Sequence, residues 1–161
     1  METSQNIKIP EMREQLRDPE STLTQCQIDD ICGSFLAAIE AGKEEADKFG
    51  FAYSIAKVLL NAYSRLLNKR VLERPEGHKI YVNSVHPGGV MTDMNPIGTV
   101  TIEEGADTGV WLSLLPKGVT PSGLFFFQRK PLSYEGETAF NPQAFKAQID
   151  LHFAARETQS V

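Results

Sequence analysis

A strand signal that ends at a proline and glycine turn limits how this 161-residue chain can fold. Residues 79–85, KIYVNSV, are rich in β-branched side chains and stop just before the turn that contains Pro87, which predicts a strand. LFFFQRK at 124–130 predicts a second strand. Between them, 101–116 begins with a threonine cap and two acidic residues, as helix N-termini do. Strand, helix and strand in this order predict parallel strands joined by a crossover helix, and hence an α/β fold.

Two strands are too few to complete such a fold. Parallel sheets normally contain several strands and are covered on both faces. A two-stranded sheet would leave its edges and its apolar side chains uncovered. We therefore expect the chain to correspond to the second half of a larger domain.

The first half of the sequence predicts helices. Residues 1–20 are polar and contain two prolines, which favours a loop that includes at most a short helical turn. Apolar residues at helical spacing then predict an amphipathic helix that closes at Gly42. After a charged link, the same spacing predicts a second helix over 52–72. A last helix is expected at 141–156.

The composition indicates one globular domain that does not bind polyanions. With a formal net charge of −5, a pI near 5.2 and no long basic run, neither nucleic acid nor an anionic membrane is an expected partner. No apolar stretch approaches the roughly 20 residues of a membrane helix, and the polar start lacks a signal-peptide core, so we expect a cytoplasmic protein. Cys26 and Cys32 have no partners at metal-ligand spacing, which predicts reduced thiols and no metal site.

Tyr53 and Lys57 form a candidate catalytic pair. Residues four apart on a helix lie on the same face, so the phenol and the ammonium group can meet. A nearby cation favours the ionised phenol, which would help Tyr53 to transfer a proton. The alternative is chance, because a tyrosine and a lysine at this spacing occur on many helices.

The turn after the first strand is a candidate ligand loop, because α/β sheets bind ligands in loops that follow strand ends. Pro87 stiffens the turn, Gly88 and Gly89 let the backbone approach a ligand, and Thr92 can hydrogen-bond an amide or a phosphate. His86 is expected to be structural. A plain tight turn is the alternative reading.

Together these segments resemble the short-chain dehydrogenase/reductase family. The resemblance is carried by YSIAK, VNSVHPGGVMTDM, TIEEGADTGVWLSLLP and SGLFFFQRK, within about residues 20–130. More narrowly, the sequence is similar to the branch of carbonyl reductase, menthol dehydrogenase and salutaridine reductase, in which an inserted helical segment precedes the tyrosine.

The resemblance implies the C-terminal half of a Rossmann-like, doubly wound parallel sheet. Residues 1–50 would be the inserted helical segment near the N-terminus. Residues 51–133 would hold the catalytic helix, the strand, the cofactor loop, the crossover helix and the last strand. Residues 134–161 would be a C-terminal extension.

The implied activity is NADPH-dependent reduction of a ketone or aldehyde to an alcohol, with NADH left open as cofactor. Tyr53 would donate the proton to the carbonyl oxygen, and Lys57 would bind the nicotinamide ribose and assist the tyrosine. This fits the chemistry, because hydride arriving at carbonyl carbon leaves negative charge on oxygen. The cofactor-binding residues implied are Tyr53, Lys57, Pro87, Gly88, Val90 and Thr92.

The sequence also departs from the family. The glycine-rich dinucleotide loop, the Asn-Asn-Ala-Gly segment and the catalytic serine have no match, and Ser34 and Ser54 lie in the wrong context to replace the serine. Without the phosphate-binding turn, no helix N-terminus is prepared for the pyrophosphate. We therefore expect the isolated chain to be weakly active or inactive. Two alternatives stay open: an incomplete record of an ordinary enzyme, or a non-enzymatic truncated protein that associates with a full-length relative.

Overall fold

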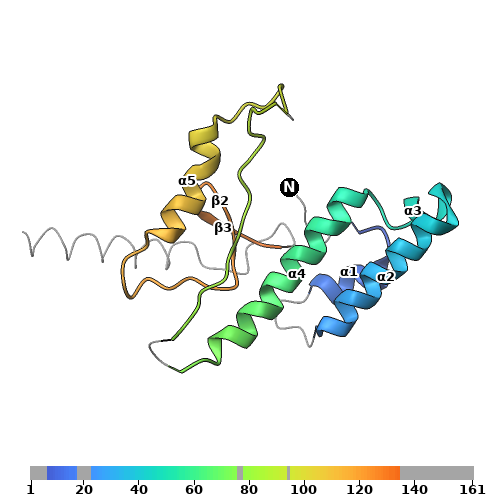
Figure 1. The fold of residues 1–161 in the computed structure, drawn as a ribbon, viewed down its shortest axis with the longest axis horizontal. Coiled ribbons are helices and arrows are strands. Elements are labelled where there is room, and N and C mark those ends of the chain that lie inside the picture. Colours follow the sequence, from blue (N-terminus) through green and yellow to red (C-terminus); the bar gives the residue numbers. More distant parts are fainter. Residues whose placement is uncertain (1–6, 18–22, 76–77, 94, 135–161) are drawn as a thin grey trace, which may run out of the picture.

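The chain folds into a group of helices followed by a small sheet with one further helix (Figure 1). The computed structural model describes residues 7–17, 23–75, 78–93 and 95–134, so the helix expected at 141–156 lies outside the described residues. The elements are α1 (Pro10–Arg17), α2 (Gln25–Ala41), α3 (Lys43–Asp47), α4 (Ala52–Leu72), β1 (Ser84–Val85), α5 (Ile102–Ser113), β2 (Phe125–Phe127) and β3 (Lys130–Leu132).

The helices α2 and α4 have the bounds that the sequence predicts, whereas α5 ends at Ser113, before the predicted end at Pro116. Before α2, Thr24 accepts a hydrogen bond from the Gln27 amide and Gln27 accepts one from the Thr24 amide, a reciprocal capping box. The helix closes at Gly42, whose φ of 122° is in a region that favours glycine. Within 1–20, where the sequence predicts a loop with at most a short helical turn, residues 10–17 form the longer helix α1, with Leu16 buried. The charged link also contains the short helix α3.

A hydrophobic core holds α1, α2 and α4 together. At its centre, Ala62 of α4 is completely buried, and Leu16 and Ile55 are about 1% exposed. Burying a leucine or isoleucine side chain contributes on the order of 1.5–3 kcal/mol to stability. The core consists of Ile7, Leu16, Leu23, Ile28, Ile31, Phe35, Phe49, Ile55, Val58, Leu59 and Ala62.

The sheet has the strand order β1-β2-β3. The strands β1 and β2 are parallel, with Ser84 opposite Phe125 and Val85 opposite Phe126, which confirms the predicted parallel pair. In the second pair, β3 runs antiparallel to β2. The described part of the chain therefore contains a partial Rossmann-like α/β arrangement.

Both strands are shorter than predicted. Of residues 79–85 only the last two form a strand, because side chains replace the backbone hydrogen bonds of the sheet before them. The Ser122 hydroxyl accepts a hydrogen bond from the Val82 backbone amide at 2.9 Å, and the Asn83 side-chain amide donates one to the Pro121 carbonyl. At the other strand, Gln128 and Arg129 have positive φ angles of 49° and 59° and turn the chain back into β3. Positive φ at two adjacent positions is the geometry of tight hairpin turns.

The helix α4 connects the helical core to the sheet, and Figure 1 shows it between α1 and α2 on one side and the sheet with α5 on the other. Near the end of α4, the side-chain oxygen of Asn68 accepts a hydrogen bond from the Ser122 hydroxyl. A Cβ on Gly123 would lie 2.5 Å from the Asn68 side-chain nitrogen, so the chain passes close to Asn68 there. Arg65 donates to the Leu16 carbonyl, and its guanidinium lies 4.5 Å from the centre of the Tyr134 ring.

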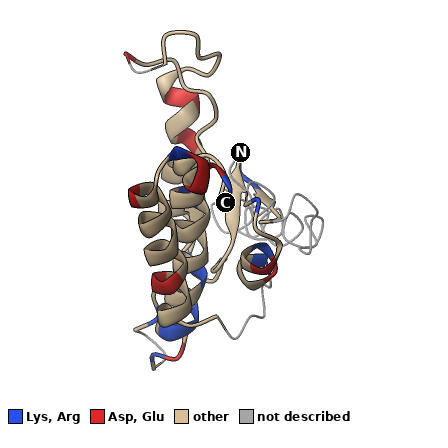
Figure 2. Ribbon diagram, turned by 90° about the vertical axis from the view of Figure 1, so that its right-hand side faces the viewer, with Lys and Arg blue, Asp and Glu red and all other residues tan. Residues whose placement is uncertain are grey.

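Acidic and basic residues are interspersed along the helices in the view of Figure 2. Among the residues that the structure describes, no helix is both long enough and apolar enough to cross a membrane. Cytoplasmic location stays a prediction.

We predict that Phe126→Ala lowers the free energy of unfolding by about 3–5 kcal/mol, the usual cost of removing a buried phenylalanine. Phe126 is completely buried in β2, and its ring centre lies 5.9 Å from that of Trp111 in an edge-on contact. The matched control is Phe51→Ala, because Phe51 is 74% exposed and its loss should change stability by less than about 0.5 kcal/mol. Urea unfolding followed by tryptophan fluorescence measures both, and equal losses would contradict a stabilising role for the burial of Phe126 beside Trp111.

Candidate active site

Tyr53 and Lys57 lie side by side at the start of α4. The Lys57 ammonium nitrogen lies 5.4 Å from the centre of the Tyr53 ring, within the distance of a cation–π contact. Tyr53 is 57% exposed, and Lys57 is exposed as well. The predicted pair is therefore formed, and both side chains are open to a second molecule.

The orientation of this pair follows from the opposite face of α4. Ser54, Ile55 and Val58 are buried, with 7%, 1% and 4% of their surface exposed. Because apolar residues at this spacing occupy one helix face, packing them into the core turns Tyr53 and Lys57 outward. Ser54 belongs to the packed face and does not share the exposed surface of Tyr53.

The candidate ligand loop follows β1 and folds back on itself before α5. The Gly89 carbonyl accepts hydrogen bonds from the amides of Thr99 and Val100 at 3.0 and 3.1 Å, and the Met91 amide donates to the Val100 carbonyl at 2.8 Å. A further tight turn joins Thr92 to Asn95, whose amides donate to each other's carbonyls. The predicted residues Pro87, Gly88, Val90 and Thr92 all lie on this hydrogen-bonded loop.

The two glycines of the loop have different roles. Gly88 has a φ of 87°, and a Cβ there would lie 3.0 Å from a Val100 methyl group and 3.4 Å from the Phe127 ring. Gly88 therefore allows close packing within the protein. A Cβ on Gly89 would have no atom within 4 Å. The open backbone that a ligand could approach is at Gly89, whereas Thr92 is exposed beyond it.

Gly105 and Asn95 position the loop, and the sequence reasoning missed both. A Cβ on Gly105 of α5 would lie 2.5 Å from a Val90 methyl group and 3.5 Å from the Pro87 carbonyl oxygen. The Asn95 side-chain amide donates to the Val90 carbonyl at 3.0 Å. Val90 therefore packs its side chain on α5, which leaves only its backbone for ligand contact. The available signal was a glycine inside an amphipathic helical pattern, which often marks a close approach.

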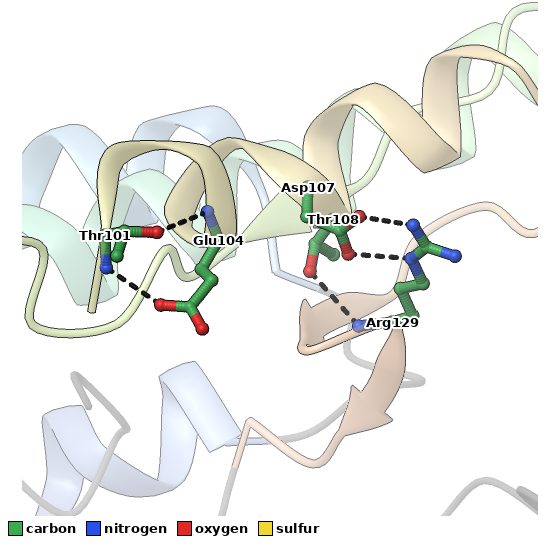
Figure 3. A network of polar contacts seen from close by, with 5 residues as sticks. All are labelled: Thr101, Glu104, Asp107, Thr108 and Arg129. Atoms are coloured by element: carbon green, nitrogen blue, oxygen red, sulfur yellow. Dashed lines mark hydrogen bonds and ion pairs between the residues drawn. The ribbon is translucent and has the colours of Figure 1, made fainter.

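Two sets of polar contacts hold the first half of α5 in place (Figure 3). At its start, the Glu104 amide donates to the Thr101 hydroxyl at 3.2 Å, and the Thr101 amide donates to the Glu104 carboxylate at 2.9 Å. One turn later, Arg129 donates to both carboxylate oxygens of Asp107, and its backbone amide donates to the Thr108 hydroxyl at 3.1 Å. These hydrogen bonds from Arg129 lower the pKa of the Asp107 carboxyl group, with a smaller contribution from its positive charge.

A cavity of about 560 Å³ lies between the loop, α5 and the turn after β2. His86 lies at its edge, with its ring centre 5.4 Å from that of Phe127 and 6.5 Å from that of Phe125, which supports a structural role. Pro87 also lines the cavity, but Tyr53 and Lys57 do not. The Tyr53–Lys57 pair and the candidate ligand loop are thus each ordered, and the pair does not line the cavity beside the loop.

Comparisons with known proteins point to one enzyme family, although no family model matches the chain. The chain is 41% identical to short-chain dehydrogenase/reductase 1 of Saponaria officinalis over 135 residues, which are 80% of this chain and 42% of that protein. It is 40% identical to (+)-neomenthol dehydrogenase of Arabidopsis thaliana over 71% of this chain and 38% of that protein. The chain is 31% identical to human carbonyl reductase 1 (NADPH), over 75% of this chain and 44% of that protein.

A solved structure agrees with these relatives. Salutaridine reductase from Papaver somniferum superposes with a TM-score of 0.65 and 32% identity, over 77% of this chain and 41% of that chain. The chain therefore belongs to the short-chain dehydrogenase/reductase family, as its motifs indicated. It spans about two fifths of the length of these relatives.

We predict opposite effects for two glycine substitutions one turn apart on α5. Gly105→Ala forces Val90 away, so it should lower the free energy of unfolding by about 1–3 kcal/mol, as overpacking does, and shift the amide signals of the loop. Gly109→Ala meets no atom within 4 Å and should raise stability by about 0.5–1 kcal/mol through its helix preference. Amide NMR spectra and urea unfolding measure both effects. An unchanged Val90 signal in Gly105→Ala would show that α5 does not position the loop.

The ion pair between Asp107 and Arg129 should make the folding stability of the chain depend on pH in the acidic range. The folded pKa of Asp107 is below its unfolded value, so its contribution is complete above the ordinary pKa near 3.8 and is lost as the pH falls through the folded pKa. The difference in Tm between the wild type and Asp107→Asn should therefore be largest near neutral pH and shrink below about pH 4. Thermal scans from pH 7 to pH 2.5 test this, with Asp93→Asn in the exposed loop as control. A difference that is independent of pH would refute it.

Proposed function

We propose that the chain provides the proton donor and part of the nicotinamide site of an NADPH-dependent carbonyl reductase that converts a ketone or aldehyde to an alcohol. The main support is the exposed Tyr53 phenol with the Lys57 ammonium group 5.4 Å from its ring, on a helix anchored by the hydrophobic core. NADPH is favoured because one relative's name specifies it. NADH is the other nicotinamide cofactor that the proposal admits.

The residues of this chain account for the proton transfer. The cofactor, when bound, supplies the hydride for the carbonyl carbon. As negative charge grows on the carbonyl oxygen, Tyr53 donates its phenolic proton to that oxygen. Lys57 lies on the same face of α4, with its ammonium nitrogen 5.4 Å from the centre of the Tyr53 ring, so its positive charge is close to the group that loses the proton. A solvent proton then restores Tyr53.

The loop after β1 fits the amide end of a nicotinamide. An amide group needs both donors and acceptors, and the backbone of Pro87, Gly88 and Val90, with the exposed Thr92 hydroxyl, offers both kinds. The loop is held by its own hydrogen bonds and by α5. A loop that is ordered before binding loses less entropy when the ligand binds. The ammonium group of Lys57 would hydrogen-bond the ribose.

The isolated chain is proposed to be weakly active or inactive. It spans about two fifths of the length of its relatives, and the catalytic pair does not line the cavity beside the loop. Proton donation requires the donor within hydrogen-bond distance of the substrate, in a position held by the surrounding protein. The remainder of the family fold would bring the two groups together.

The test is a chimera in which this chain replaces the matching segment of the Saponaria relative. Carbonyl-dependent oxidation of NADPH should be lost in Tyr53→Phe by about 10²–10⁴-fold in kcat, the usual contribution of a general acid. The matched control is Tyr63→Phe on the same helix, where Tyr63 is 37% exposed, and its kcat should not change. The isolated chain is assayed in parallel and should give no turnover. Full activity of the Tyr53→Phe chimera would disprove the proposed acid.

A second candidate function is binding to a full-length relative without catalysis. It is favoured by large apolar side chains that stay exposed at and before the start of α4 and along it: Phe51, just before the helix, is 74% exposed, and Leu60 is 53% exposed. Exposed apolar groups of this kind often mark interaction surfaces. In this case Tyr53 and Lys57 would belong to a contact surface.

A further inference from the structure

The helix that carries Tyr53 and Lys57 has a polar anchor near its other end, at Asn68. Residues eleven positions apart on an α-helix are separated by about three turns and point in directions that differ by only about 20°. Asn68 therefore lies on the same side of α4 as Lys57. The contact that Asn68 makes shows what this side of the helix faces, because its side chain hydrogen-bonds with Ser122, just before β2.

The contact at Asn68 is both close and directional. The Ser122 hydroxyl donates to the side-chain oxygen of Asn68. Gly123 has a φ of 73°, and its backbone passes so near that a Cβ there would lie 2.5 Å from the Asn68 side-chain nitrogen. A hydrogen bond needs a defined distance and angle, whereas the apolar packing on the opposite face of α4 is non-directional. The bond at Asn68 is therefore suited to fix the rotation of α4 about its axis.

The same serine also reaches the strand that carries the candidate ligand loop. The Ser122 hydroxyl oxygen accepts a hydrogen bond from the Val82 backbone amide at 2.9 Å, and the Gly123 amide donates to the Val82 carbonyl at 2.7 Å. Val82 stands just before β1, and the loop follows β1 directly. Asn68, Ser122 and Val82 thus connect α4 to the strand that leads into the loop.

We propose that Asn68 is a positioning residue for the proton transfer. Its hydrogen bond to Ser122 fixes the rotation of α4 relative to β1, and this rotation places the Tyr53 phenol with respect to the ligand loop. The inference rests on the proposed reductase function, in which Tyr53 is the acid.

A small rotation of α4 is enough to affect this step. Helix side chains end about 5–6 Å from the helix axis, so a rotation of about 10° moves their tips by roughly 1 Å. Because Tyr53 is 57% exposed, its position follows that of the helix. A displacement of about 1 Å in an active site can lower the rate by about 100-fold.

Residual dipolar couplings of the 161-residue chain measure the rotation directly. In the wild type, the amide couplings of α4 and of residues 82–86 and 124–132 should fit one common orientation. Asn68→Ala removes the acceptor but leaves the Ser122 hydroxyl for Val82, so its α4 couplings should no longer fit the orientation of the strands. The matched control is Ser64→Ala on the same helix. The Ser64 hydroxyl donates to the Leu60 carbonyl within α4, so this variant should fit as the wild type does.

Kinetics in the chimera with the Saponaria relative measure the effect on catalysis. Asn68→Ala should lower kcat by about 10- to 100-fold, because it misplaces the acid. The KM for NADPH should change by less than about threefold, because it follows binding in the ground state. Asn68→Asp keeps a side-chain oxygen as acceptor and should restore kcat. A residue that only stabilises the fold would lower Tm and leave the kcat of the folded enzyme unchanged.

Circular dichroism verifies that each variant is folded. If Asn68→Ala is not, Asn68→Gln takes its place, because it keeps the amide group but moves it by one methylene group. The proposal fails if the folded variant keeps the wild-type orientation of α4, if it keeps the wild-type kcat, or if Asn68→Asp does not restore the rate. Retained activity in Tyr53→Phe would instead refute the proposed acid, and the dipolar couplings alone would then decide whether Asn68 fixes α4.

Discussion

The packing of α4 is the constraint on which the rest of this structure depends. One face of the helix, including Ile55 and Ala62, is buried against α1 and α2, while Asn68 near its end hydrogen-bonds with Ser122 next to the sheet. The same helix therefore joins the two groups of elements and orients the candidate pair, Tyr53 and Lys57. Because Tyr53 and Lys57 lie on the face that the core leaves outside, their exposure follows from the burial of their neighbours.

The two parts of the candidate site, the Tyr53–Lys57 pair and the loop after β1, are held in place by different interactions. The pair on α4 is positioned by hydrophobic burial, whereas the loop after β1 is positioned by close backbone packing at Gly88 and Gly105. Glycine is needed there because any side chain would occupy space held by Val100 or Val90. The pair and the loop are each ordered by the elements that carry them.

Several parts of this fold were predictable from local signals. The bounds of α2 and α4 and the start of α5 agree with caps and apolar spacing, because a helix forms hydrogen bonds within its own segment. The parallel pair was predictable from the order of strand, helix and strand. The strand lengths were not, since Asn83 and Ser122 replace ladder bonds with side-chain bonds from distant positions. The length of α1 was not predictable beyond a short helical turn, because the helix buries Leu16 against other segments.

By itself, the sequence determined the membership of the family, the helices and the identity of the candidate residues, because motifs and periodicity depend on neighbours along the chain. Only the tertiary structure decided which residues are accessible and which support others. The Val90 side chain packs on Gly105, so only the backbone of Val90 is open in the loop. Arg129 hydrogen-bonds with Asp107 and Thr108 and so ties α5 to the turn after β2. These relations join residues that are distant in sequence, so they depend on how the elements pack in space.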